Sequence, residues 1–492
     1  MFKAPKIAQL NFTVGDIQGN TAKILAAAKG NELVVFSEMC ITGYPAEDLW
    51  SKPGFIKKEQ EALAKITKLA EAPIIIGASH SKEDKLYNSA YYIHDGKAQI
   101  VAHKCNLPNY GVFDDKRYFT GGKYLKLLPD GTAVLVCEDV WKTQRIDEAK
   151  AKGAKAIISI NASPYEFGKY KRRHELAKAA GLPFVYVNNV GGQDEILFDG
   201  ASFYFDGTSI KTAPAFEEFV GKLEKVAPVY LKEESNYKAM CLGLKDYVHK
   251  NGFKKVLLGV SGGIDSALVA AIAADALGKE NVRGAILPTK YSSKITMEDA
   301  YGVCKALGIP HEEHEVWDHY KKEEGLTAEN MQSRTRGLML MALSNKHNEL
   351  LLTTGNKSEI ATGYCTIYGD MNGAFNPIKD LYKTEVYDVV KWRGGLPERV
   401  LTKAPTAELR DNQTDQDSLP PYDVLDGILR QLLEERKLAE EVTGYDAVTV
   451  QKVAKLVKTS EFKRRQAAPG TKLSSVAFGK DWRMPISNKF TS

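Results

Sequence analysis

Two patterns of hydrophobic and polar residues divide the chain. Between residues 7 and 205, short apolar runs alternate with longer amphipathic stretches, which predicts strands interleaved with helices. Strands are predicted over 33–36, 73–76, 90–93, 100–103, 133–136, 156–160 and 184–187, and helices over 57–69 and 169–180. Asp95-Gly96 joins two of these strands and is a strong hairpin signal. We therefore expect a mixed sheet covered by helices.

The pattern changes after residue 211. Charged residues and proline replace clear periodicity over 211–235, and strands then alternate regularly with helices. The expected order is helix 237–250, strand 255–260, helix 266–277, strand 282–287, helix 296–307, strand 313–316, helix 328–344 and strand 350–353. Such alternation predicts a parallel sheet with right-handed crossovers. We expect a first domain over 1–215, a linker over 216–236 and a second domain over 237–492.

Composition narrows the class of protein. The 492 residues, 43% hydrophobic and 26% charged, are typical of a folded protein of two to four domains. A net charge of +5 is too small and too dispersed for a nucleic-acid groove or a membrane surface, but it suits small anionic substrates. The longest apolar run, 267–274, is too short for a membrane helix. With no secretory signal at the N-terminus, we expect a cytoplasmic protein.

The six cysteines lack paired short spacings, which excludes a disulfide framework and a zinc ribbon. A reactive thiol is the better interpretation of any special cysteine. The histidine-rich segment 311–314, with His319 nearby, lacks the spacing of His-Glu-x-x-His. We therefore expect an exposed, charged edge there and no metal site.

The segment 261–266, Ser-Gly-Gly-Ile-Asp-Ser, follows a buried strand and opens a helix. The glycines allow close approach of a phosphate, the first helical N–H groups lack internal partners, and Ser261 and Ser266 add hydroxyl donors. The spacing and lysine of a P-loop ATPase are absent, and Asp265 in place of that lysine suggests metal coordination. A plain glycine turn is the alternative interpretation of the Gly-Gly pair alone.

The whole string resembles the phosphate loop of ATP pyrophosphatases, which split ATP into AMP and pyrophosphate. The segments 328–336, 354–359, 369–370, 381–385, 405–410 and 417–422 further resemble successive motifs of NAD synthetases. The resemblance implies ATP-binding residues Ser261, Gly262, Gly263, Asp265, Ser266, Thr354 and Lys383, a magnesium site at Asp265 and Glu359, and a deamido-NAD site at Asn330, Arg334 and Asp370. Each of these charged residues, taken alone, is more often part of a solvated helix face.

Three reactive side chains follow predicted strands of the first half. Glu38 follows strand 33–36, Lys104 follows 100–103 and Cys137 follows 133–136. We expect them at one sheet edge, where the carboxylate can take the thiol proton and the ammonium can stabilise thiolate and oxyanion during amide hydrolysis. The alternative interpretation is that Cys137 is an unreactive thiol buried in the core. A Cys–His protease is disfavoured because His103 neighbours Lys104 and should face the opposite side of its strand.

This arrangement is that of nitrilases, and the segments 36–49, 107–114, 137–141, 161–165 and 191–195 resemble the glutaminase domain of glutamine-dependent NAD synthetases. The resemblance implies an α-β-β-α sandwich, a catalytic set of Glu38, Lys104 and Cys137, glutamine-binding residues Tyr110, Glu138 and Ser163, and an oxyanion hole at the amide after Cys137. Three positions depart from the family pattern: Ser37 stands for proline, Asn189 for glutamine and Asp115 for glutamate.

Together the two halves resemble an α/β amidotransferase that follows its nitrilase-like domain with a Rossmann-like synthetase domain. Glutamine would supply ammonia through a Cys137 thioester, and ATP with Mg²⁺ would adenylate deamido-NAD, which ammonia converts to NAD. The resemblance also implies a homo-oligomer with dimerising synthetase domains, an ammonia channel and a basic stretch at 463–470. Two alternatives remain: another ATP-pyrophosphatase amidotransferase, and a nitrilase-fold hydrolase whose second half senses nucleotide.

Overall fold

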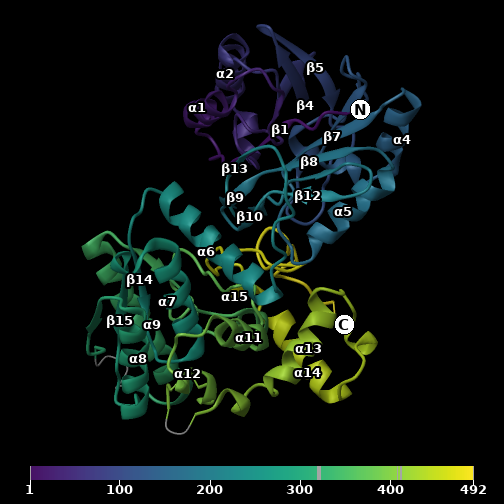
Figure 1. Cartoon of the computed structure of the whole chain (residues 1–492). Helices are drawn as coiled ribbons and strands as arrows, with labels where there is room; N and C mark the ends of the chain where they lie inside the picture. Colours follow the sequence, from purple (N-terminus) through teal and green to yellow (C-terminus); the bar gives the residue numbers. More distant parts are fainter. Residues whose placement is uncertain (1, 318–322, 407, 411–412, 491–492) are drawn as a thin grey trace. The chain divides into compact units, whose positions relative to one another are not determined.

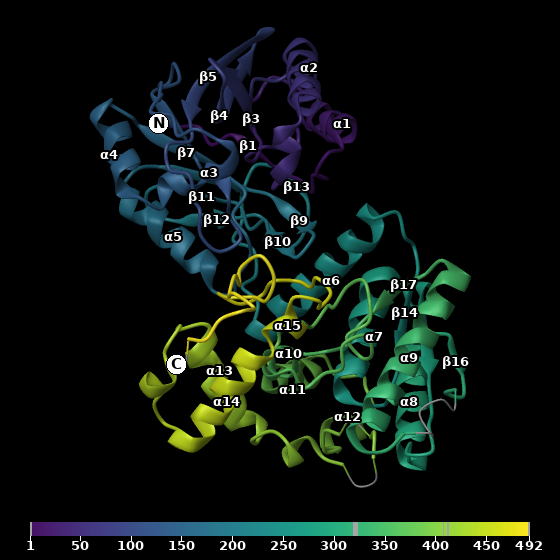
Figure 2. The same cartoon turned by 180° about the vertical axis from the view of Figure 1, so that it is seen from behind.

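The computed structural model describes residues 2–317, 323–406, 408–410 and 413–490. The chain forms two compact units, Met1–Val229 and Tyr230–Ser492, coloured purple to teal and teal to yellow in Figures 1 and 2. The boundary falls inside the stretch 216–236 that we expected as a linker. Within that stretch, β13 (Phe219–Gly221) belongs to a sheet of the first unit, and α6 (Lys232–Lys250) begins the second. None of the described helices is long and apolar enough to span a membrane.

The first unit contains two large sheets and a small hairpin. The six-stranded sheet has the order β13-β1-β2-β3-β4-β5 and the five-stranded sheet has the order β12-β11-β8-β7-β6. The first sheet adds β1 (Lys6–Gln9), β2 (Val34–Val35), β3 (Ile74–Lys82), β4 (Lys85–His94) and β5 (Lys97–His103). The second contains β6 (Thr132–Val136), β7 (Ala156–Asn161), β8 (Phe184–Asn188), β11 (Phe203–Phe205) and β12 (Ile210–Thr212), and the hairpin is β9 (Val190–Gln193) with β10 (Ile196–Asp199).

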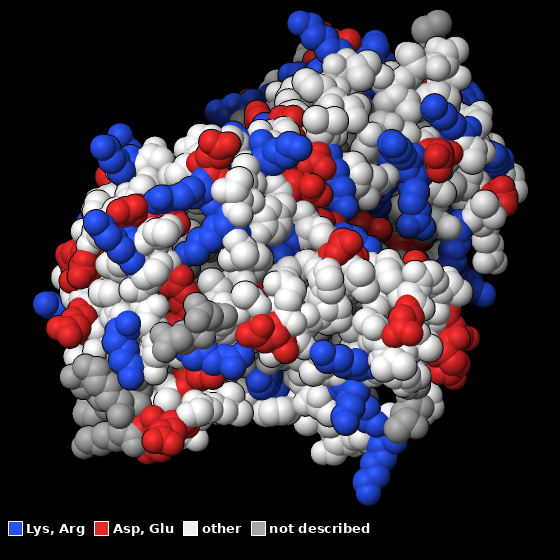
Figure 3. Space-filling view, turned by 90° about the horizontal axis from the view of Figure 1, so that it is seen from below, with Lys and Arg blue, Asp and Glu red and all other residues white. Residues whose placement is uncertain are grey.

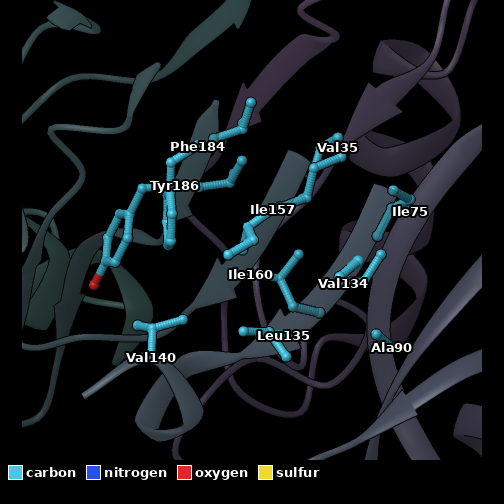
Figure 4. Packing of buried hydrophobic residues seen from close by; sticks show 14 of the residues in the cluster. Val35, Ile75, Ala90, Val134, Leu135, Val140, Ile157, Ile160, Phe184 and Tyr186 are labelled. Atoms are coloured by element: carbon cyan, nitrogen blue, oxygen red, sulfur yellow. The ribbon is translucent and has the colours of Figure 1, made fainter. Parts of the chain in front are cut away.

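The two sheets pack face to face, because each has one apolar face directed toward the other. Val35 and Ile75 of the first sheet share a buried cluster with Val134 and Ile157 of the second (Figure 4). Each β-strand presents alternate side chains to opposite faces, so the other face of each sheet needs its own cover.

Helices provide that cover. Apolar residues of α1 (Ile17–Ala27) and α2 (Pro53–Leu69) pack on the outer face of the first sheet. Those of α4 (Thr143–Ala151) and α5 (Lys169–Ala180) pack with residues of the second. The expected α-β-β-α sandwich is confirmed. Shorter elements are η1 (Glu47–Ser51), α3 (Asp115–Tyr118) and η2 (Cys137–Val140).

The hairpin predicted at Asp95-Gly96 is confirmed, since β4 and β5 are antiparallel and pair His94 with Lys97 across it. The periodicity did not indicate α1 or the strands β9 to β13, of which β9 and β10 form the small hairpin. These elements are short or, in α1, interrupted by polar residues that turn out to be buried, such as Asn20 and Thr21.

The second unit is built on a parallel sheet of order β16-β15-β14-β17, as the alternation predicted. Its strands are β14 (Val256–Gly259), β15 (Val282–Ile286), β16 (His311–Glu313) and β17 (Leu350–Leu352). The strand predicted over 313–316 was wrong: the edge strand lies earlier, on an exposed charged segment. An edge strand needs only main-chain pairing, whereas Val316 is buried in a separate small cluster.

Helices and short 3₁₀ turns, labelled η, complete the described part of this unit. They are α6, α7 (Ile264–Leu277), η3 (Lys279–Asn281), α8 (Lys294–Leu307), α9 (Gly325–His347), α10 (Lys357–Thr362), α11 (Lys383–Arg393), α12 (Arg399–Thr402), η5 (Asp415–Asp417), α13 (Tyr422–Leu433), η6 (Ala439–Glu441), α14 (Ala447–Thr459) and α15 (Glu461–Arg464). Helix α7 is buried almost all round, as its alanine-rich sequence requires. Helices α10, α13 and α14 share a further apolar core. Basic and acidic side chains are interspersed on the face in Figure 3, consistent with the small net charge.

Candidate active sites

Glu38 lies just after β2 and is fully buried. Its Oε1 accepts hydrogen bonds from Lys104 Nζ and Asn88 Nδ2, both at 2.7 Å. Its Oε2 accepts one from the Ala162 amide at 2.9 Å. Gly77 on β3 makes room for this turn, because a Cβ there would lie 2.7 Å from the Glu38 Cα. The carboxylate is therefore held at both oxygens.

Lys104, just after β5, is also fully buried. Besides Glu38, its Nζ donates to Asp115 Oδ2 at 2.6 Å, and Tyr44 donates to the other oxygen of Asp115 at 2.9 Å. Burial alone would lower the pKa of this lysine, but the two carboxylates raise it well above its usual range. Lys104 therefore keeps its positive charge. Asp115 contacts it directly, although its side chain is shorter than that of the glutamate expected at this position.

Cys137 begins η2 directly after β6 and is 3% exposed. Its φ of +46° is a left-handed conformation that a non-glycine residue rarely adopts, which is common for side chains aimed into active sites. Burial and the Glu38 carboxylate raise the pKa of the thiol well above its usual range, while Lys104 and the Ala162 amide act against this shift. The resting thiol is therefore protonated, and its activation requires a base.

One expectation about these residues was wrong. Glu38 and Lys104 follow strands of the six-stranded sheet, whereas Cys137 follows a strand of the five-stranded sheet. The three groups meet because the two sheets pack face to face, and not because they share one sheet edge. Local periodicity predicts each strand but does not assign it to a sheet.

His103 is directed away from this cluster, as the alternation of β5 predicts. Its Nδ1 lies 2.8 Å from Ser89 Oγ, and its ring stacks on Tyr87 with centroids 4.7 Å apart. Burial lowers the pKa of His103 to about 4, so its ring is neutral. The structure therefore gives the Cys–His interpretation no support.

The residues expected to bind glutamine lie around Cys137. Tyr110 is exposed, and its hydroxyl donates to Glu138 Oε2 at 2.9 Å. Ser163 is buried, and its Oγ accepts from Arg173 Nη2 at 3.2 Å. Arg173 is itself paired with Asp199 at 2.9 Å. Ser163 thus has a rigid support, and the face around Cys137 carries both hydroxyl and carboxylate groups.

Lys169, at the start of α5, was not indicated by the sequence. Its Nζ donates to the Pro164 carbonyl at 3.2 Å and lies 5.8 Å from the centre of the Trp141 ring. Burial and the neighbouring Arg173 lower the pKa of Lys169 to about 8, and Cys137 is among the groups that act on it. It is a cation beside the thiol whose charge is only partly satisfied. A lysine in a basic helix gives no sequence signal for this position.

Two of the three departures from the family pattern are paired in space. The Ser37 hydroxyl donates to Asn189 Oδ1, and both residues are buried. This bond links the turn before Glu38 to the connection between β8 and β9. Ser37 and Asn189 therefore join these two segments through one buried hydrogen bond.

The second unit holds a cavity of about 320 Å³ at the carboxyl ends of its parallel strands. Most of the predicted ATP residues line it: Ser261, Gly263, Asp265, Ser266, Thr354 and Lys383. Glu359, predicted as a magnesium ligand, lines it too. The Ser261 amide and hydroxyl both contact Ser266 Oγ, at 3.2 and 3.1 Å, so the loop is closed on itself at the start of α7. This placement suits an anion at a helix N-terminus.

Gly262 is not among the residues that line the cavity. Its φ is +77°, and a Cβ there would lie 2.7 Å from the Thr296 carbonyl of α8. The glycine is required by the shape of the loop and by its contact with α8. Its predicted contact with ATP stays a prediction.

Two carboxylates converge on one lysine in the cavity. Lys383 Nζ contacts Asp265 Oδ2 and lies 3.5 Å from Glu359 Oε1. Asn356 donates to Asp265 at 3.0 Å and also caps α10, where its side chain accepts from the Glu359 amide. Burial and Asp265 raise the pKa of Glu359, whereas Lys383 opposes that shift.

This charge distribution fits a divalent cation. Asp265 and Glu359 bring two negative charges to a single lysine, and Asp415 also lines the cavity. Among the described residues, no group of three or more His, Cys, Asp or Glu side chains could hold a metal by itself. Mg²⁺ typically takes one or two carboxylates together with substrate phosphates. The histidines of 311–314 form an exposed edge with His314 against Glu312, as predicted, although His319 lies outside the described residues.

The three residues expected to bind deamido-NAD are not all in this cavity. Asp370 lines it, and its Oδ1 accepts from the Thr366 amide at 2.6 Å. Asn330 is not among the residues that line it, and its Oδ1 accepts from Thr366 Oγ1 at 3.1 Å. Arg334 is exposed, and its Nε donates to the Ile367 carbonyl at 3.2 Å. All three residues therefore lie in the segment 366–370 or contact it.

Further polar residues of the cavity were not predicted: Thr296, Arg336, Lys403, Thr406, Glu408 and Asp415. Glu408 accepts from Lys403 Nζ at 3.2 Å and from the Thr296 hydroxyl. Thr406 and Glu408 lie in a segment whose resemblance was noted without any role for single residues. Lys403 lies outside the motifs, so only the fold could place it here.

Each of the two units matches a known protein family. The carbon-nitrogen hydrolase family matches residues 7–221, and the NAD synthase family matches residues 236–467. A glutamine-dependent NAD(+) synthetase of Xanthomonas campestris is 42% identical, with 99% of this chain and 97% of that protein covered. One of Thermotoga maritima is 41% identical, with 98% of each covered.

Solved structures agree. The glutamine-dependent NAD+ synthetase of Acinetobacter baumannii, in complex with ADP, is 38% identical, covers 98% of both chains and has a TM-score of 0.77. That of Cytophaga hutchinsonii has a TM-score of 0.82 at 22% identity, which supports the fold. The similarity extends over both units and over nearly the full length of each relative. The chain therefore belongs to the glutamine-dependent NAD(+) synthetases, ligases that join a nitrilase-like glutaminase domain to an ATP-using NAD synthetase domain.

Proposed function

We propose that Cys137 is the nucleophile that releases ammonia from glutamine. Glu38 takes the thiol proton while Sγ attacks the carboxamide carbon, and it returns that proton to the departing ammonia. A water molecule then attacks the thioester, with Glu38 again as the base, and glutamate and the free thiol are restored. The observation that supports this assignment is the buried cluster of Glu38, Lys104 and Cys137.

Lys104 supplies positive charge in this proposal. It is held between Glu38 and Asp115, so it stays charged while the thiolate and the oxyanion develop. The backbone amide of Glu138, directly after Cys137, is the expected second donor to the oxyanion. Because these donors are fixed before the substrate arrives, little reorganisation is needed during the reaction.

Tyr110, Glu138 and Ser163 are the proposed glutamine-binding residues. The Glu138 carboxylate suits the ammonium of a free amino acid, and the hydroxyls suit its polar groups. We add Lys169 as the partner of the glutamine α-carboxylate. It is a cation near Cys137 with an incompletely satisfied charge.

In the second unit, we propose that Ser261, Gly263, Ser266, Thr354 and Lys383 bind the ATP phosphates. Asp265 and Glu359 would hold Mg²⁺, which would neutralise phosphate charge as the pyrophosphate leaves. Lys383 lies between the two carboxylates in this structure, and its positive charge would also suit the ATP phosphates. The nicotinate carboxylate of deamido-NAD attacks the α-phosphorus of ATP and gives an acyl adenylate.

Asn330, Arg334 and Asp370 are the proposed deamido-NAD residues. Their shared position around the segment 366–370 supports a single binding region beside the ATP cavity. Ammonia from the first unit displaces AMP from the adenylate and gives NAD. The family resemblance also leads us to propose a homo-oligomer with dimerising synthetase domains, and residence in the cytoplasm.

The experiment supplies ATP, deamido-NAD and either glutamine or ammonium, and measures NAD, AMP, pyrophosphate and glutamate. With Mg²⁺ present we expect NAD and AMP in equal amounts from both nitrogen sources, and neither NAD nor AMP once the divalent cation is chelated. The Asp265→Ala variant should fail with either source. AMP formation at the normal rate by this variant would contradict the proposed metal site. Inability to amidate deamido-NAD would instead favour a different ATP-pyrophosphatase amidotransferase.

A further inference from the structure

Asn88 is a buried amide in contact with Glu38 that the proposed mechanism does not use. It lies in β4, opposite Ser79 of β3, and is fully buried. Its Nδ2 donates to Glu38 Oε1 at 2.7 Å. Its backbone carbonyl accepts from the Lys104 amide at 2.8 Å. One residue thus contacts the base through its side chain and the cation through its main chain.

The other end of this side chain is unsatisfied. Asn88 Oδ1 is buried and has no hydrogen-bond partner among the described residues. Leaving a buried acceptor unpaired costs stability, and an apolar residue would avoid that cost. A flip of the amide would direct its oxygen at the Glu38 carboxylate and would be repelled. The orientation therefore serves Glu38 at the expense of Asn88 itself.

The bond also distinguishes the two oxygens of Glu38. Oε1 accepts from both Asn88 and Lys104, at 2.7 Å each. Oε2 has a single donor among the described residues, the Ala162 amide at 2.9 Å, and the same amide acts on the Cys137 thiol. A carboxylate oxygen with two strong donors has little capacity left for a proton, whereas one with a single donor keeps a free lone pair.

We propose that Asn88 is a positioning residue of the glutaminase site, which together with Lys104 anchors Oε1 of Glu38 and leaves Oε2 as the oxygen that takes the proton of Cys137. This inference rests on the proposed role of Glu38 as the base. Within the described part of the chain, Asn88 forms no hydrogen bond with the thiol, so it acts through Glu38. Its neutral donor holds the carboxylate without adding a charge that would compete with Lys104.

Loss of the hydrogen bond from Asn88 to Glu38 should change the pH profile of glutamine hydrolysis. The titratable groups that face Glu38 are Lys104, Asp115, Tyr44 and Cys137. Lys104 is a fixed cation, and burial keeps Tyr44 protonated. Removal of the Asn88 donor makes protonation of the Glu38 carboxylate easier, since hydrogen bonds to a charged form favour that form. The base would then be lost at a higher pH than in the wild type.

The test compares glutamine hydrolysis by the full-length wild type, Asn88→Leu and Asn88→Asp over a range of pH. For Asn88→Leu we expect kcat to fall about 10- to 100-fold, KM to stay within about two-fold, and the acid limb of kcat/KM to move upward by about one pH unit. Asn88→Asp keeps the shape but places a like charge against Glu38, so its acid limb should move further. If Asn88→Leu does not fold, the isosteric Asn88→Asp carries the test alone.

Gln60→Leu is the matched control, because Gln60 donates to the Ser79 carbonyl at 3.0 Å and forms no hydrogen bond with Glu38 among the residues that the structure describes. It should keep the wild-type profile. An unchanged kcat in a folded Asn88 variant would overturn the inference, and so would a fall in kcat with the acid limb in place, since that would indicate a merely structural role. Glu38→Gln, assayed in parallel, separates the two proposals: if it still hydrolyses glutamine, the role of Glu38 fails, and if it is inactive while the Asn88 variants are normal, only this inference fails.

Discussion

Lys104 and Lys383 show how the same residue type is used at both sites. Each is buried and lies between two carboxylates: Glu38 and Asp115 contact the first, Asp265 and Glu359 the second. A buried lysine without partners would lose its charge, but these carboxylates raise the pKa of both lysines. Each of these lysines therefore provides a permanent positive charge, where a thiolate and oxyanion are expected at the first site and phosphates at the second.

Asp115 can be tested by removing its charge. Asp115→Asn leaves Lys104 with one carboxylate, so the lysine is drawn further toward Glu38 and weakens it as a base. We expect glutamine hydrolysis to fall by about 10-fold or more and, because one partner of a buried pair is lost, stability to fall by about 3–5 kcal/mol. Steady-state kinetics and thermal melts of the full chain measure both. The control is Asp147→Asn, an exposed position of α4, and equal behaviour of the two variants would refute this role of Asp115.

Lys169 gives a pH prediction. Its pKa is lowered to about 8 by burial and by Arg173, so the side chain is charged below that pH and neutral above it. If it binds the glutamine carboxylate, the KM for glutamine should rise as the pH passes through about 8, while ammonium-driven synthesis shows no matching change. Lys169→Met should have a high KM at every pH and a flat profile. A KM of Lys169→Met equal to that of the wild type at pH 7 would argue against the assignment.

Some of these residues could be predicted from sequence and others could not. Glu38, Lys104 and Cys137 are reactive residue types placed just after apolar strands, so their position alone suggested chemistry. Asn88 and Tyr44 carry no such signal, because an amide within a strand and a tyrosine in a loop are common. Their roles depend on distances across two elements, and only the folded structure supplies these.

At the scale of elements, the loop before α7 and the start of α10 line the same cavity. Asn356 caps α10 with its carbonyl and donates to Asp265 of α7 with its amide, at 3.0 Å. Just beyond it, buried Lys357 pairs with Asp380 at 2.9 Å and donates to Ser474 near the C-terminus at 2.8 Å. The sequence predicted β14 and α7 with the loop between them, but not this bracing by a distant segment, since hydrogen bonds between remote segments leave no local pattern.

The role of Gly262 is testable at this scale. In Gly262→Ala the loop must adopt a positive φ with a side chain, and the new Cβ would lie 2.7 Å from the Thr296 carbonyl. We expect NAD synthesis to fall by about 100-fold with either nitrogen source, as the phosphate loop shifts against α8. Glutamine hydrolysis, which belongs to the other unit, should persist.

The matched control is Gly302→Ala, inside α8, where the nearest atom to a new Cβ is Pro397 Cγ at 3.4 Å. A helical alanine at that position should be neutral or stabilise by up to about 1 kcal/mol. NAD synthesis by both variants at the wild-type rate would show that the loop tolerates a side chain and that the conformational role of Gly262 is mistaken.

At the scale of the whole molecule, each unit has its own core and its own candidate site. The switch from a mixed strand pattern to regular strand–helix alternation predicted two architectures in one chain, and the compact units agree with it. The return of β13 to pair with β1 could not be predicted, because a three-residue strand far from its partner has no distinctive pattern. The assignment of strands to two facing sheets also depended on resemblance and not on periodicity.

The central claim is that one unit releases nitrogen through a cysteine and the other consumes it with ATP. Cys137→Ala removes the sulfur but leaves the cavity of the second unit intact. The measurement is the rate at which this variant forms NAD and AMP, first with glutamine and then with ammonium as the nitrogen source. We predict no NAD above background with glutamine and a wild-type rate with ammonium. Synthesis from glutamine at the normal rate, or loss of synthesis from both sources in a folded variant, would contradict the account.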